Sequence, residues 1–345
     1  MLQHLRVLTG LLRQRRGKIM TIMVVDVGGT NIRFGRSRTV TDSLSDIQSF
    51  KCSDFASIEE AVAAYVESLE DMRGVNFEAV SIAVAAPIIG DHIDVTNNHW
   101  QFNKSELINK ISANSLLVVN DFVAQALAQA DKVASKYQPI ICGQKRTESP
   151  LLVIGPGTGL GVAALVPMKP DFFVIEGEGG HARFKPHDGL ERELETYLLK
   201  QQCHVSIENV ISGPGLETIH CFLCDRAGVK AKASSAAEIG AEALEGVELP
   251  RQAALLLLNA LASVIVDNIF TMGCWQGAVI TGGVVPKLSK LIHESDFKKR
   301  FQSSGKLRKI LEEIPVWLST DPMTGLVGAQ FALSNSFLRA KLVFK

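Results

Sequence analysis

Short apolar runs that end in glycine-rich turns recur along the chain. Residues 22–27 (IMVVDV) are followed by the turn GGTN and a second run, IRFG, which predicts a β-hairpin. Residues 151–155 (LLVIG) lead through PGTGLG into VAALV and predict a second hairpin of the same kind. Because one such unit occurs in each half of the chain, the pattern indicates an internal duplication.

The other apolar segments alternate between strand and helix patterns. Residues 81–88 and 115–120 are short, continuously apolar runs typical of buried strands, whereas 58–71 has the spacing of an amphipathic helix. Residues 251–272 are almost wholly apolar, which predicts a helix buried in a large protein. A last helical pattern, residues 326–340, closes the chain. Strands that alternate with helices predict an α/β fold.

Length, charge and cysteine content exclude several classes of protein. The length of 345 residues predicts two domains. A formal net charge of +0 argues against nucleic-acid binding, and no apolar run reaches the roughly 18 residues of a membrane span. The six cysteines lack the spacing of a disulfide framework, so we expect reduced thiols and a cytoplasmic location. For Cys221 and Cys224, two half-buried helix cysteines are favoured over zinc or redox chemistry.

The first 25 residues are basic and contain no acidic side chain. Four leucines fall on one face of a possible helix, as in an amphipathic targeting presequence. The alternative, which we favour, is an upstream extension over residues 1–19, with the working domain beginning at Met20 or Met23. The basic residues are Arg6, Arg13, Arg15, Arg16 and Lys18.

Three glycine-rich turns follow predicted strands and are candidates for phosphate binding. Their uncovered backbone N–H groups can form a concave anion site, to which a threonine hydroxyl adds a donor. None matches GxxxxGK[ST] or GxGxxG, which disfavours the nucleotide folds that those patterns mark. Asp26 ends the first strand, where its carboxylate could hold Mg²⁺ or bind the turn amides. The turns contain Gly28, Gly29, Thr30, Asn31, Gly157, Thr158, Gly159, Gly282 and Gly283.

Polar residues at two further places are candidates for sugar chemistry. Asn120 and Asp121 end a strand before a helix, so either an N-cap or a base at the carboxyl end of the strand explains them. Glu178 and His181 lie in a glycine-rich loop suited to binding a polyol, because carboxylates accept hydrogen bonds from hydroxyls. A metal site is the weaker alternative there, since no second His or Cys lies at ligand spacing. Glu208 alone would be an ordinary exposed carboxylate at a helix start.

In this order, the segments resemble the bacterial glucokinase family of the actin-like ATPase superfamily. DVGGTNIRFG and GPGTGLGVA are similar to its two phosphate loops, and VVNDF to its catalytic strand end. VTNNHWQF, GEGGHARF and HVSIENVISGPGL are similar to its sugar loops, and ITGGVVPK to its adenosine segment. The resemblance runs from about Thr21 to the C-terminal helix and covers nearly all of the chain except the basic extension.

The resemblance implies an ATP-dependent glucokinase that phosphorylates the 6-hydroxyl of glucose, the first step of glycolysis. It implies that Asp121 is the general base and that Asp26 is associated with Mg²⁺. The glycine turns at residues 28–30 and 157–159 would surround the phosphates of ATP, and Gly282 and Gly283 would lie on the adenosine side. The residues that it assigns to the sugar are Asn97, Asn120, Glu178, His181 and Glu208.

The resemblance also implies a duplicated, ribonuclease H-like fold of two domains with the site in the cleft between them. The small domain would comprise residues 20–131 and 323–345, the large domain residues 132–322, and the protein would be a homodimer. Two departures bear on the sugar site: Arg183 stands where the family has an acidic residue, and VTNNHW leaves Asn97 and Asn98 interchangeable in alignment. The alternatives are a kinase of another hexose or N-acetylhexosamine, and a non-sugar actin-like ATPase.

Overall fold

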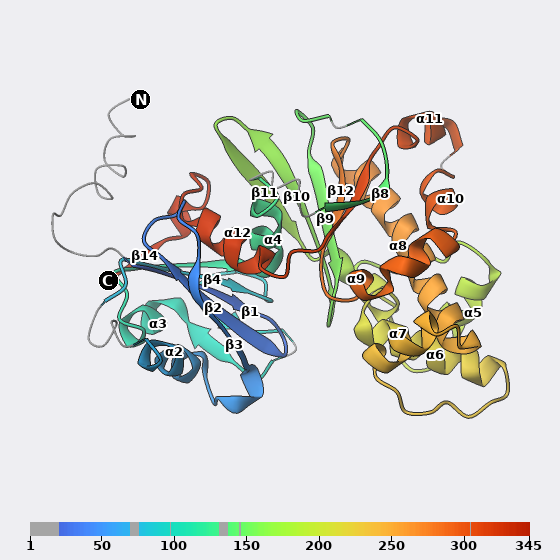
Figure 1. The fold of residues 1–345 in the computed structure, drawn as a ribbon, viewed down its shortest axis with the longest axis horizontal. Coiled ribbons are helices and arrows are strands. Elements are labelled where there is room, and N and C mark those ends of the chain that lie inside the picture. Colours follow the sequence, from blue (N-terminus) through green and yellow to red (C-terminus); the bar gives the residue numbers. More distant parts are fainter. Residues whose placement is uncertain (1–20, 70–75, 97, 131–136, 145, 304) are drawn as a thin grey trace.

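A computed structural model describes residues 21–69, 76–96, 98–130, 137–144, 146–303 and 305–345 (Figure 1). Two of the sequence predictions, the basic extension over residues 1–19 and the sugar contact at Asn97, lie outside the described residues.

The first half of the chain builds a six-stranded sheet in the order β14-β7-β4-β1-β2-β3. Strands β1, β2 and β3 form an antiparallel meander, β1, β4 and β7 run parallel, and β14 closes the edge antiparallel to β7. The strands are β1 (Ile22–Val27), β2 (Asn31–Ser37), β3 (Ser45–Lys51), β4 (Ala79–Val84), β7 (Ser115–Asn120) and β14 (Val343–Phe344).

The second sheet repeats this arrangement in the order β11-β10-β9-β12-β13-β8. An antiparallel meander is again followed by parallel strands and an antiparallel edge strand, so the two sheets share both order and direction. The duplication predicted from the two hairpins is therefore seen in the topology. The strands are β8 (Tyr137–Ile141), β9 (Leu151–Pro156), β10 (Leu160–Met168), β11 (Asp171–Gly177), β12 (Gly277–Ile280) and β13 (Val316–Ser319).

Helices α4 and α12 lie between the two sheets and share one apolar core with both (Figure 1). Their backbones approach closely, because a Cβ at Gly328 of α12 would lie 1.7 Å from the Ala124 carbonyl oxygen of α4. The helices are α2 (Ile58–Glu67), α3 (Lys104–Lys110), α4 (Asp121–Leu127), α5 (Gly189–Leu199), α6 (Gly213–Arg226), α7 (Ala236–Leu244), α8 (Glu248–Met272), α9 (Val285–Leu288), α10 (Phe297–Phe301), α11 (Arg308–Leu311) and α12 (Thr324–Ala332). A small ribbon of β5 (His92–Asp94) and β6 (Gln101–Asn103) completes the fold.

The long apolar helix α8 is a core helix of the second half, as predicted. It packs against α6, α7 and α10. Contrary to the expectation that no segment would qualify, α8 is long and apolar enough to cross a membrane by length and composition, but 67% of its most apolar window is buried within the fold. This burial accounts for an apolar helix without requiring a lipid environment.

The closing helix is shorter than predicted. The pattern indicated residues 326–340, whereas α12 ends at Ala332 and β14 forms the last strand. Three residues beyond the end of α12, the Asn335 side-chain amide donates to the Asp171 carboxylate at 3.0 Å and to the Phe172 carbonyl at 2.8 Å. Its Oδ1 accepts from the backbone N–H of Phe337, two residues further along the chain, at 3.0 Å. Such side-chain bonds compete with helix continuation.

Candidate active site

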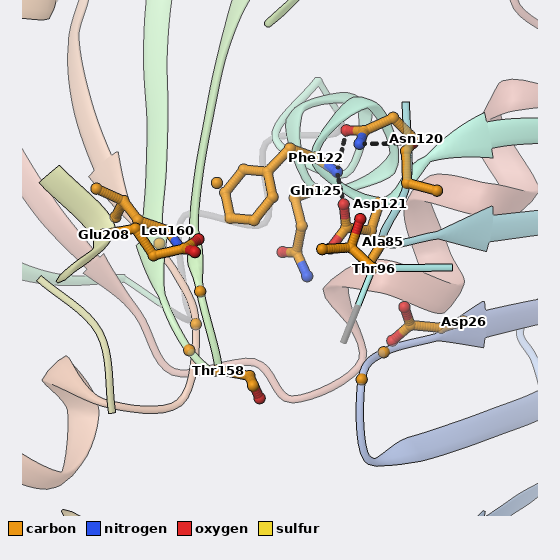
Figure 2. A pocket seen from close by; sticks show the side chains of 18 of the residues that line it. Asp26, Ala85, Thr96, Asn120, Asp121, Phe122, Gln125, Thr158, Leu160 and Glu208 are labelled. Atoms are coloured by element: carbon orange, nitrogen blue, oxygen red, sulfur yellow. Dashed lines mark hydrogen bonds between the residues drawn. The ribbon is translucent and has the colours of Figure 1, made fainter. Parts of the chain in front are cut away.

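The carboxyl ends of strands from both sheets surround one cavity of about 300 Å³ (Figure 2). Open α/β sheets place ligands at this end of their strands. Among the predicted residues that the structure describes, Gly283 does not line the cavity. The predicted residues that do are Asp26, Gly28, Gly29, Thr30, Asn31, Asn120, Asp121, Gly157, Thr158, Gly159, Glu178, His181, Glu208 and Gly282.

Asn120 is the N-cap of α4, so the structural alternative raised from sequence holds for this residue. Its Oδ1 accepts from the backbone N–H of Phe122 at 2.8 Å and of Val123 at 3.3 Å, and its Nδ2 donates to the Ala86 carbonyl at 3.2 Å. An amide nitrogen carries two hydrogens, which leaves one donor for a ligand in the cavity.

Asp121 begins α4 and presents its carboxylate to the cavity, close to Asn120 (Figure 2). Its Oδ1 accepts from the Phe122 N–H at 3.0 Å, and no described residue donates to Oδ2. Burial, together with the negative charges of Asp26 and Glu178, raises the pKa of Asp121 to about 7. A carboxylate with such a pKa can take a proton at neutral pH, as a general base must.

Asp26 is the residue before the last in β1 and faces the same cavity. The sequence left open a bond to the turn amides, but its partner is Arg33, whose Nη1 lies 3.3 Å from Oδ2. Burial raises the pKa of Asp26, and the Arg33 guanidinium opposes that rise. Helix α12 also packs onto this carboxylate, because a Cβ at Gly325 would lie 2.4 Å from Oδ2.

The first glycine turn is held from the neighbouring loop. The Gly28 N–H donates to the Asn31 carbonyl at 2.9 Å, and the Gly28 carbonyl accepts from the Asn98 side-chain amide at 3.3 Å. Asn98 is one of the two asparagines left interchangeable by the sequence. It therefore connects the VTNNHW loop to this turn, while Thr96 of the same loop lines the cavity (Figure 2).

The sugar-loop residues differ in their exposure. Glu178 and His181 are about half exposed, with side-chain exposures of 50% and 55%, and Glu178 Oε2 lies 3.9 Å from His181 Nε2. Two open, polar side chains at the cavity rim suit hydroxyl groups of a ligand. Throughout the described ranges, no cluster of three His, Cys, Asp or Glu side chains could hold a metal ion.

Phe122 joins the two halves of the site and was not anticipated from sequence. Its ring fills space beside β9 and β10 that glycine leaves open: a Cβ at Gly155 would lie 2.9 Å from the ring and one at Gly161 only 1.8 Å. The residue after Asp121 thus fixes where the second glycine turn lies. The polar lining residues Arg33, Thr96 and Gln125 were also not predicted as site residues.

The cysteines are free, as expected from their spacing. Cys221 is exposed and Cys224 buried on α6, and Cys224 Sγ lies 3.5 Å from His220 Nε2. Both cysteines lie on a helix, as predicted, but one is exposed and the other buried, whereas the prediction was that both are half-buried.

Comparison with known proteins covers nearly the whole chain. A family model described as glucokinase matches residues 23–336. A glucokinase of Hahella chejuensis is 33% identical over 319 residues, which is 92% of this chain and 98% of that protein. The crystal structure of a glucokinase from an Antarctic psychrotroph superposes with a TM-score of 0.78 at 31% identity, covering 92% of this chain and 100% of the other. A glucokinase of Balamuthia mandrillaris in complex with glucose shares the fold, with a TM-score of 0.76 at 20% identity over 94% of this chain and 98% of the other.

Proposed function

The chain belongs to the glucokinase family, and from this premise we propose that it transfers the γ-phosphoryl group of ATP to the 6-hydroxyl of glucose. The observation that carries the proposal is the position of Asp121. Its carboxylate lies in one cavity with glycine turns from both sheets and with Glu178, His181 and Glu208. Turn amides suit phosphate, and the carboxylates and imidazole suit hydroxyls.

Asp121 is the proposed general base. Its free oxygen, Oδ2, accepts the hydrogen bond of the sugar 6-hydroxyl and takes the proton as the hydroxyl oxygen bonds to the γ-phosphorus and the bond to ADP breaks. Glu178, His181, Glu208 and the remaining amide hydrogen of Asn120 hold the other hydroxyls. Backbone N–H groups of the glycine turns stabilise the charge on the transferred group, where most catalysis of phosphoryl transfer resides.

Asp26 fits Mg²⁺, because its carboxylate lines the cavity beside the first glycine turn and Arg33 bonds to Oδ2, while Oδ1 has no partner among the described residues. This ion binds proteins through one or two carboxylates and completes its shell with water and substrate phosphates, so a large cluster of protein ligands is not required. Asp26 would hold it, directly or through water, beside the first glycine turn. When bound with ATP, the ion neutralises negative charge on the phosphates.

The duplicated sheets support the finer assignment to the actin-like, ribonuclease H-like fold. We propose a small domain of residues 20–131 and 323–345 and a large domain of residues 132–322, with the cavity in the cleft between them. Contacts of α12 with β1 and β4 support placing the C-terminal segment with the first sheet. Closure of the cleft would exclude water and suppress ATP hydrolysis. A cytoplasmic homodimer remains part of the proposal.

The substrate is tested by initial rates with saturating MgATP and a panel of sugars, measured by release of ADP. We expect kcat/KM for glucose to exceed that for mannose, fructose and N-acetylglucosamine. A higher value for one of those sugars would reassign the substrate within the kinases. ATP hydrolysis at the same rate with and without sugar, and no phosphorylated sugar, would instead indicate a non-sugar ATPase.

The pH dependence of kcat/KM should show the titration of Asp121, the proposed general base. Because the pKa of Asp121 in the free protein is raised to about 7, the carboxylate is protonated in acid and active above that pH. We expect kcat/KM for glucose to rise about tenfold per pH unit below pH 7 and to level off above about pH 8. A profile that is flat between about pH 5.5 and 8.5 would contradict this assignment.

A further inference from the structure

Glu208 reaches from the proposed sugar site to the second glycine turn. Its Oε2 accepts from the backbone N–H of Leu160 at 2.8 Å, and Figure 2 shows its side chain beside Leu160, on the strand that follows Thr158. Gly159 makes this contact possible, because a Cβ there would lie 2.2 Å from Oε2. The carboxylate therefore packs directly against the backbone of the turn.

The Leu160 N–H has no partner in the hairpin itself. Leu160 and Pro156 face each other as a non-hydrogen-bonded pair, because the bond next to them runs from the Gly157 N–H to the Gly159 carbonyl at 2.8 Å, so the Leu160 N–H points away from β9. Leu160 is 5% exposed, and Glu208 is the described acceptor of its N–H, so loss of Glu208 would leave this donor without a protein partner. Buried backbone donors are almost always paired, which makes Glu208 a required partner of the turn.

A second contact ties the same two segments together. The Gly213 N–H donates to the Gly157 carbonyl at 2.8 Å, and the Ser212 hydroxyl donates to the carbonyl of Glu208 at 2.8 Å. The segment that carries Glu208 therefore holds the turn at both of its ends. No hydrogen bond to the other carboxylate oxygen, Oε1, occurs within the part of the chain that the structure describes, and Glu208 lines the cavity.

We propose that Glu208 contributes to the sugar site and to the nucleotide site at the same time. Its Oε2 holds the phosphate-binding turn through Leu160, and its Oε1 accepts a hydrogen bond from a sugar hydroxyl. This inference rests on the proposed glucokinase function, and makes Glu208 a positioning residue for the nucleotide as well as a sugar contact. A sugar that fixes the Glu208 side chain also fixes the turn. Glucose and nucleotide should then each increase the affinity for the other by the same factor.

The direction in which nucleotide affinity changes when Glu208 is replaced distinguishes a holding role from simple charge repulsion. A carboxylate near the phosphates repels them, so loss of its charge alone would tighten nucleotide binding. If Glu208 holds the turn, its removal should instead weaken nucleotide binding, because the turn loses the partner that orders it. We expect Glu208→Ala to weaken MgAMPPNP binding in the absence of sugar by about fivefold, as ordering of a loop contributes to affinity.

Titration calorimetry of MgAMPPNP without sugar tests this expectation. Glu208→Gln keeps an acceptor for the Leu160 N–H and loses only the charge, so it should bind MgAMPPNP as tightly as the wild type or more tightly. Glu178→Ala is the matched control: it removes a carboxylate from the same cavity that makes no bond to the turn, so binding should be unchanged or tighter. Unchanged or tighter binding by Glu208→Ala would overturn the proposal.

Two further measurements test the proposal if Glu208→Ala does not fold or if its effect on affinity has another cause. If Glu208→Ala does not fold, Gly159→Ala replaces it, because its methyl group would displace the carboxylate; unaltered MgAMPPNP affinity would again contradict the proposal. In the wild type, glucose should lower the dissociation constant of MgAMPPNP at least fivefold, and in Glu208→Ala by less than twofold. If the wild type forms no glucose 6-phosphate, the proposed function fails; if it does and the affinities do not follow this pattern, the coupling alone fails.

Discussion

Asp121→Asn is expected to lower kcat for glucose phosphorylation by about 10²- to 10⁴-fold, the usual contribution of a general base. Asparagine keeps the shape of the side chain and can still accept from the Phe122 N–H, but it cannot take the hydroxyl proton. KM for glucose and ATP should change little, because the other contacts remain. Steady-state kinetics at pH 8 measure this directly.

A stability measurement separates loss of the base from loss of the fold. Because the pKa of Asp121 is raised to about 7, the folded state binds more protons than the unfolded state between about pH 4 and 7, and stability falls as pH rises through that window. Removal of the charge should therefore stabilise the protein at pH 8, by roughly 4 kcal/mol, with no gain near pH 4. If Asp121→Asn is less stable than the wild type at pH 8, the conclusion that a buried negative charge on Asp121 destabilises the fold at that pH is wrong.

Gly161→Ala is expected to impair both folding and catalysis. Its methyl group would lie 1.8 Å from the Phe122 ring, so either the ring or β10 must move. Overpacking of this kind costs about 1–3 kcal/mol, and movement of β10 displaces the second glycine turn from Asp121. We expect a fall in kcat of about tenfold or more, since small misplacements of reacting groups are costly.

The Phe122 ring provides the control for this prediction. In the double variant Phe122→Ala with Gly161→Ala, the obstructing ring is absent, so the methyl group should cost less than it does alone. Gly189→Ala, where a Cβ meets nothing within 4 Å, should leave the melting temperature and kcat close to wild type. Additive effects in the double variant would show that the ring is not the obstacle.

The sequence predicted those parts of the fold that local pattern determines. Both hairpins, the strands before Asp121 and the apolar helix over residues 251–272 follow from runs of apolar residues and from glycine turns. The end of α12 did not follow from the pattern. Asn335, three residues beyond that end, bonds to Asp171, which is distant in the sequence. Helix pattern alone carries no information about such a partner.

The same distinction applies to the site. The types of residue in the glycine turns and polar loops predicted most of the residues that line the cavity. The hydrogen-bond partners of these residues depend on strand register and on packing, which local sequence does not show. Arg33 pairs with Asp26 because the hairpin register places them opposite each other, which the positions flanking the GGTN turn could have indicated. The bond between Glu208 and Leu160 joins residues 48 positions apart and leaves no local signal. Phe122 lies in the helix predicted after Asp121, but the contacts of its ring with β9 and β10 depend on the packing of both sheets.

The most direct test of the central claim is the product formed from glucose and MgATP by the wild type and by Asp121→Asn, followed by phosphorus NMR. We predict that the wild type forms glucose 6-phosphate and ADP in equal amounts, and that the variant, at equal concentration and with an intact fold, forms almost none in the same time. Phosphorylation at another hydroxyl, ADP without a sugar phosphate, or near-wild-type turnover by the variant would contradict the account.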